Sequence, residues 1–149
     1  IDVNEGNGCL RMLPGSHLLN NFYREPGMLS YQELVETIES RYMQDIPMKT
    51  GQVMFMNTRT IHGSSPNLSS EMRPAAAGVA IPADLPLLCC YSDEQTNPDE
   101  IKVFEVPDDF YTRHTLRSFP KEGQLCKTVP RQVEYLSIEN IATMFHKSS

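Results

Sequence analysis

Two residues of this 149-residue chain, His62 and Arg73, have types and a spacing that suit metal and carboxylate chemistry. His62 ends an apolar run before a glycine-containing polar loop, and Arg73 follows eleven positions later. A hairpin at this spacing would place the two side chains next to each other. A neutral imidazole is a common ligand for iron, zinc or copper, and a guanidinium matches the two oxygens of a carboxylate. The pair could therefore bind a metal and a chelating keto acid. A structural arginine beside a histidine at the edge of the core fits the spacing equally well.

The other three histidines carry weaker signals. His17 follows a Pro-Gly-Ser turn, whereas His114 and His146 lie in polar or helical surroundings. We interpret His114 and His146 as packed or solvated side chains. His146 lies near the end of a predicted helix, where a histidine can complement the helix dipole.

Short strands are expected to position these residues. Five apolar runs of strand length are bounded by turn residues: 9–13, 53–56, 58–62, 75–81 and 101–106. Pro14-Gly15 ends the first run as a turn.

Two helices interrupt the strands. Ser30 and Glu33 form a capping box ahead of a predicted amphipathic helix over residues 31–43. Ser137 begins a last helix. Frequent short strands with one inserted helix and a C-terminal helix predict a mostly β fold, an antiparallel barrel or jelly roll.

The composition of the chain limits the kinds of partner that it is expected to bind. The net charge of −6 disfavours a nucleic acid or an anionic membrane surface, since binders of those carry basic patches. There is no apolar run long enough to span a bilayer and no signal-peptide pattern. The four cysteines form no C-x-x-C pair, so we expect reduced, mostly buried thiols in a cytoplasmic protein that acts on a small molecule.

Two motifs resemble the phytanoyl-CoA dioxygenase family of iron(II)- and 2-oxoglutarate-dependent oxygenases. The first is N-G-C-L-R-M-L-P-G-S-H over residues 7–17. The second is G-Q-V-M-F over 51–55, followed by H-G-S-S-P-N-L-S over 62–69 and then by Arg73. The resemblance implies a double-stranded β-helix (a cupin-like jelly roll) and hydroxylation of a small organic substrate with release of succinate and carbon dioxide.

The resemblance also implies roles for single residues. His62 matches the distal histidine of the family's iron(II) site, and Arg73 matches the arginine that grips 2-oxoglutarate. Ser64 matches a position that also contacts this carboxylate. Asn67 matches a recurrent asparagine that we expect to brace the loop, and we interpret His17 as structural or substrate-facing. No residue is assigned as catalytic.

One departure from the family pattern is large. The family takes two iron ligands from an H-x-D motif, and no histidine of this chain is followed two positions later by an acid. With Ile1 instead of Met at the start, this favours the C-terminal part of a longer oxygenase domain, incomplete at its N-terminus. Residues 1–82 would then be the motif-bearing barrel core and residues 83–149 a C-terminal extension. A smaller departure is Ala75, where many related oxygenases carry a serine.

Three hypotheses follow. The chain belongs to an Fe(II)/2-oxoglutarate-dependent dioxygenase, or it is a non-catalytic cupin-like binding module that has lost its metal site. In the third, His17 and His62 are ligands of another cupin-type metalloenzyme. Because a jelly roll without its early strands has unpaired edges, we also expect the chain to be marginally stable or to self-associate.

Overall fold

The computed structural model describes residues 1–19, 22–25, 31–93, 95–132 and 137–146. They divide into two compact units. The motif unit comprises Ile1–Asn20, Tyr31–Val79 and Tyr135–Ser149, and the meander unit comprises Asn21–Ser30 and Ala80–Glu134. No helix among the described residues is long and apolar enough to cross a membrane.

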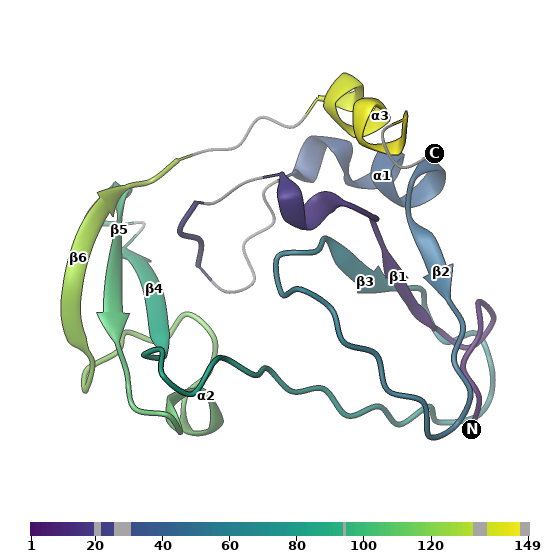
Figure 1. Cartoon of the computed structure of the whole chain (residues 1–149), viewed down its shortest axis with the longest axis horizontal. Helices are drawn as coiled ribbons and strands as arrows, with labels where there is room; N and C mark the ends of the chain where they lie inside the picture. Colours follow the sequence, from purple (N-terminus) through teal and green to yellow (C-terminus); the bar gives the residue numbers. More distant parts are fainter. Residues whose placement is uncertain (20–21, 26–30, 94, 133–136, 147–149) are drawn as a thin grey trace. The chain divides into compact units, whose positions relative to one another are not determined.

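The motif unit is built on a three-stranded antiparallel sheet in the order β2-β1-β3 (Figure 1). The strands are β1 (Leu10–Met12), β2 (Gln44–Ile46) and β3 (His62–Ser64). β1 is the central strand, and it confirms the expected strand within residues 9–13. Arg11 lies opposite Asp45 in the ladder, and their side chains form a salt bridge of 2.9 Å. This pair links β1 to β2 across the sheet.

Helices complete the core of the motif unit. The 3-10 helix η2 (Gln32–Leu34) leads into α1 (Val35–Arg41), so the predicted helix over 31–43 is confirmed but shorter. Ser30, its predicted cap, lies outside the described residues. The last helix is also confirmed, as α3 (Ile138–His146). Leu13, Ile38 and Ile141 meet as a buried cluster. The cluster packs the residue that follows β1 against α1 and α3.

The meander unit holds the second sheet, in the order β4-β5-β6. Its strands are β4 (Leu88–Asp93), β5 (Asn97–Glu105) and β6 (Gln124–Pro130), with a single turn of helix α2 (Phe110–Arg113) between β5 and β6. The expected strand over 101–106 lies within β5. Cys89, Phe104, Val106 and Phe110 form the core. On the edge strand β4, the Ser92 amide donates a 2.7 Å hydrogen bond to the buried Glu25 carboxylate. The segment that carries Glu25 therefore protects an open edge.

The mostly β class is confirmed, with two antiparallel sheets and few helices. The described residues close no barrel, and the jelly roll stays a prediction. Three expected strands are wrong: residues 53–56 and 75–81 are not strands, and of residues 58–62 only His62 lies in a strand. A strand needs a hydrogen-bonded neighbour as well as an apolar pattern, and residues 53–56 and 75–81 have no ladder partner among the described residues. Val53 is 75% and Phe55 94% exposed, so the apolar side chains that suggested burial are open to solvent.

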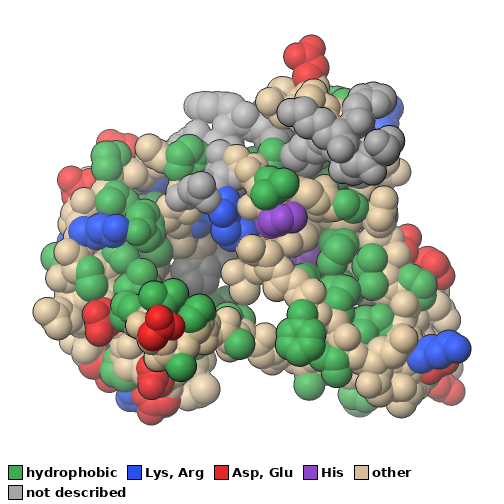
Figure 2. Space-filling model, in the orientation of Figure 1, with side chains coloured by type: hydrophobic (Ala, Val, Ile, Leu, Met, Phe, Trp, Pro, Cys, Tyr) green, Lys and Arg blue, Asp and Glu red, His purple; other side chains and the backbone are tan. Residues whose placement is uncertain are grey.

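These uncharged segments predict self-association. Residues 51–57 contain no charged side chain, and Figure 2 shows hydrophobic side chains open to solvent on this face of the motif unit. Uncharged segments of high β propensity pair readily with identical copies. We expect concentration-dependent association in sedimentation velocity, weakened about tenfold by Phe55→Lys because a buried phenyl ring contributes roughly 1.5–3 kcal/mol.

Leu18→Lys is the matched control for this experiment. Leu18 is 77% exposed but lies in the 3-10 helix η1 (Ser16–Leu18), away from both extended segments in the chain. A wild-type protein that stays monomeric at every concentration, or equal effects of the two substitutions, would contradict the prediction.

Candidate functional site

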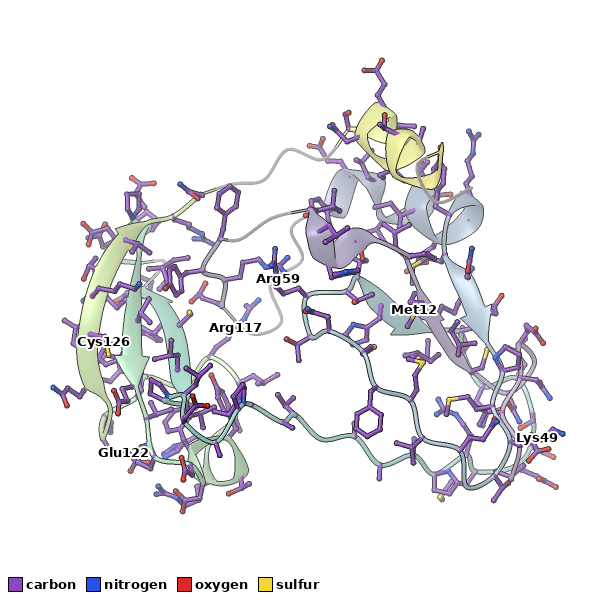
Figure 3. The ribbon with its side chains drawn as sticks, in the orientation of Figure 1. Met12, Lys49, Arg59, Arg117, Glu122 and Cys126 are labelled. Atoms are coloured by element: carbon purple, nitrogen blue, oxygen red, sulfur yellow. The ribbon has the colours of Figure 1, made fainter. Side chains whose placement is uncertain are left out.

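The two sequence motifs meet in the sheet of the motif unit. β1, from the first motif, pairs with β3, from the second, so that Met12 lies opposite His62 and Leu10 lies opposite Ser64. Figure 3 labels Met12 on β1. Because alternate residues of a strand project to the same face, His62 and Ser64 share one face of β3. The structure therefore brings two of the three predicted site residues together.

The turn after β1 continues this contact. The Leu13 amide donates to the Ile61 carbonyl over 2.9 Å. The Ser16 hydroxyl accepts a 2.8 Å hydrogen bond from the Ile61 amide and donates one of 2.7 Å to the Leu13 carbonyl. Ser16 is 3% exposed. The Pro-Gly-Ser turn is thus bonded to the residue that directly precedes His62.

Gly8 lies where the beginning of the first motif meets the loop that follows β3. Its φ is +80°, and a Cβ added there would lie 2.7 Å from the Ser65 carbonyl oxygen. Asn7 forms a bridge with Asn67. The Asn7 side chain accepts from the Asn4 amide at 2.7 Å and donates to the Asp2 carbonyl at 2.9 Å. Gly8 of the first motif is required by this close approach of two backbones.

His62 begins β3 rather than ending a strand, and its imidazole is held by the backbone. Nδ1 lies 2.8 Å from the Thr60 carbonyl oxygen. A carbonyl oxygen can only accept, so this contact favours the neutral tautomer that has its proton on Nδ1 and its lone pair on Nε2. A backbone carbonyl on one imidazole nitrogen is typical of histidines that bind a metal through the other.

The hairpin that was expected to place Arg73 beside His62 is absent from the described residues. β3 pairs with β1, and residues 72–80 are extended without being a strand, so the hairpin between His62 and Arg73 is wrong. Arg73 is half-buried, and its Nε is a buried nitrogen with no hydrogen-bond partner among the described residues. A buried donor without a partner is costly, and a carboxylate oxygen would satisfy it.

Asn67 braces the loop between β3 and Arg73, as expected. Its side-chain amide donates to the Glu71 carbonyl at 2.8 Å. Its oxygen accepts from the Ser69 amide at 3.0 Å and from the Ser69 hydroxyl at 2.7 Å. Three hydrogen bonds within five residues give this polar loop a defined path toward Arg73.

The described residues supply only some of the ligands that a metal site needs. Nowhere in the described part of the chain do three or more His, Cys, Asp or Glu side chains come together as a metal site. His17 lies in η1. The side chains present therefore fit one ligand of an iron site, from His62, and one carboxylate contact, from Arg73. They do not make a complete three-ligand site.

His114 and the cysteines lie outside this site. The His114 ring stacks on Phe110, and its Nε2 lies 3.1 Å from Glu122 in the meander unit. Glu122 is labelled in Figure 3. The hydrogen bond from His114, followed by that from Arg113, lowers the pKa of Glu122. His114 is thus a packed histidine, as interpreted. The side chain of His146 is outside the described part.

All four cysteines are free thiols, and three of them have raised pKa values. Burial is the main cause at Cys9, at Cys89 and at Cys90, whose pKa rises to about 11. Cys126 is exposed on β6. Buried thiols with raised pKa values are poor nucleophiles, which agrees with the expected structural role.

Comparison with known proteins shows the family. The family model of phytanoyl-CoA dioxygenase (PhyH) matches residues 1–75, which include both motifs and half of the chain. The chain belongs to the phytanoyl-CoA dioxygenase family, a family of iron(II)- and 2-oxoglutarate-dependent oxygenases. No curated protein and no solved structure matches it.

The sequence did not point to the roles of Ser16 and Thr60. Ser16 lay inside the first motif without an assigned function, and Thr60 lay in an apolar run. Both are buried polar residues. Only the pairing of the two motifs shows what these residues bond.

Proposed function

We propose that this chain contributes one part of the active site of an Fe(II)/2-oxoglutarate-dependent dioxygenase that hydroxylates a small organic substrate. His62 is a ligand of the iron, and Arg73 with Ser64 binds 2-oxoglutarate. The observation that supports this proposal most directly is the hydrogen bond between Nδ1 of His62 and the Thr60 carbonyl, in a chain of this family. The acidic net charge agrees with a small-molecule substrate rather than a nucleic acid.

Each residue has a role that its chemistry supports. Nε2 of His62 offers the lone pair that iron(II) needs. Arg73 offers a buried Nε–H without a partner in the described structure to the carboxylate of 2-oxoglutarate. Ser64 is exposed on the same face of β3 as His62 and offers a hydroxyl donor. The iron, when bound, supplies oxidation of the substrate by dioxygen, coupled to conversion of 2-oxoglutarate to succinate and carbon dioxide.

The proposal requires ligands from beyond these residues. A facial triad has two histidines and one carboxylate, and no H-x-D motif occurs in the 149 residues. We propose that the two further ligands come from a part of the full-length protein outside this chain.

The test is turnover by the full-length protein. We expect succinate formation from 2-oxoglutarate that depends on added Fe(II), and a fall of at least about 100-fold with His62→Ala because a metal ligand is lost. His114→Ala is the matched control, since that histidine packs in the other unit. Turnover that survives His62→Ala would exclude this residue as a ligand.

A non-catalytic cupin-like binding module is the second candidate. The observation in its favour is that the described residues offer no three-ligand group. Such a module would bind a carboxylate ligand at Arg73 with the same affinity with and without Fe(II), and it would form no succinate. Calorimetric titration of 2-oxoglutarate in the presence and absence of Fe(II) separates the two candidates.

A further inference from the structure

Ser16 connects the two motifs through a buried hydroxyl. The side chain is 3% exposed, and both of its hydrogen bonds go to backbone groups: it accepts from the Ile61 amide and donates to the Leu13 carbonyl. Leu13 in turn donates its amide to the Ile61 carbonyl. Both polar groups of the Ile61 backbone are therefore held by the turn that follows β1.

The peptide next to this anchored residue holds the imidazole. Thr60 is 8% exposed, and its carbonyl oxygen lies 2.8 Å from Nδ1 of His62. The Thr60 carbonyl and the Ile61 amide belong to the same planar peptide group. Any rotation of that group that breaks the bond to Ser16 also turns the Thr60 carbonyl away from the imidazole.

We propose that Ser16 is a positioning residue for His62. Its hydroxyl fixes the Thr60–Ile61 peptide, and that peptide fixes His62 in the tautomer with the proton on Nδ1 and the lone pair on Nε2. The tautomer does not depend on the proposed function, whereas its consequence for metal binding rests on His62 being an iron ligand.

The energetics favour a specific effect of Ser16. In Ser16→Ala, the part-buried Ile61 amide loses its described partner, whereas the Leu13 carbonyl keeps the 3.2 Å hydrogen bond from the backbone amide of residue 16. A peptide group with an unsatisfied donor reorients to find another partner. Outer partners that orient a metal-binding histidine change metal affinity by about 10- to 100-fold when they are removed.

The first readout is the tautomer of His62, measured by nitrogen NMR of 15N-histidine-labelled protein at pH 8.5, about two pH units above the reference pKa of a histidine side chain. We expect the Nδ1–H form to dominate in the wild type. In Ser16→Ala its fraction should fall clearly, and Ser16→Thr should restore it because the hydroxyl is kept. Ser40→Ala is the matched control, since the Ser40 hydroxyl also donates to a backbone carbonyl, that of Glu36, but within α1.

The second readout is the affinity of the full-length protein for Co(II) as a probe metal. Ser16→Ala should weaken it about tenfold, and Ser40→Ala should not change it. If the wild type binds no Co(II) while the tautomer responds to Ser16, the proposed metal role fails and the positioning role stands.

Three results would overturn the positioning role. These are an Nε2–H tautomer in the wild type, an unchanged tautomer in folded Ser16→Ala, and equal shifts in the Ser40→Ala control. If Ser16→Ala does not fold, Ser16→Cys decides by the same criterion, because its thiol fills the site but is only a weak donor and acceptor.

Discussion

Arg73→Ala is expected to raise the dissociation constant of the full-length protein for 2-oxoglutarate about 100-fold. This corresponds to about 2.7 kcal/mol, within the roughly 1.5–3 kcal/mol of a hydrogen bond to a charged group. The substitution removes a guanidinium whose buried Nε has no hydrogen-bond partner among the described residues. It therefore breaks no described hydrogen bond of that nitrogen, and the loss falls on the ligand.

Two further variants make this result specific. Arg73→Lys keeps the charge but loses the planar fork of donors, so we expect an intermediate loss of about tenfold. Arg41→Ala removes an exposed arginine at the end of α1 and should leave affinity unchanged. Isothermal titration calorimetry measures all three, and an unchanged affinity in Arg73→Ala would remove Arg73 from the site.

Gly8→Ala is expected to destabilise the protein by about 3 kcal/mol, lowering the melting temperature by about 10 °C. Two costs add at this position. The φ of +80° is unfavourable for a residue with a Cβ, and that Cβ would lie 2.7 Å from the Ser65 carbonyl oxygen, a backbone atom that cannot move aside alone. The contact between the two motifs must open to admit the methyl group.

Gly15→Ala separates the two costs. Gly15 has a similar φ of +77°, but an added Cβ there meets nothing within 4 Å. We therefore expect a loss of only about 1 kcal/mol. Thermal melts followed by circular dichroism compare the variants. Equal losses of stability in Gly8→Ala and Gly15→Ala would show that the close approach to Ser65 does not contribute to the free energy of unfolding.

Local patterns predicted the elements that depend on neighbours in sequence. β1, α1, the core of β5 and α3 follow from apolar spacing and turn residues, because burial of one helix face or a short apolar run is encoded within a few positions. The thiols and His114 were also interpreted correctly. β4 was missed although residues 87–91 are largely apolar, since Pro86 and the following polar residues obscured it.

Elements with exposed faces were beyond this kind of prediction. β6 is almost entirely exposed and shows no apolar alternation, so only its hydrogen bonds to β5 define it. Residues 53–56 show the opposite case. They have the composition of a strand, yet the described structure provides no neighbouring strand for them.

The sequence by itself determined the family of the chain and supplied the candidate residues for its chemistry. His62, Ser64 and Arg73 were proposed from type, order and motif, and all three lie within the residues that the family model matches. Only the tertiary structure decided how they are held. β3 pairs with β1 rather than with the segment of Arg73, the Ser16 hydroxyl accepts from the Ile61 amide, and the Thr60 carbonyl contacts the His62 imidazole. The physical reason is that the Ser16–Ile61 hydrogen bond and the β1–β3 pairing join residues 45 to 54 positions apart, and local periodicity carries no information about such partners.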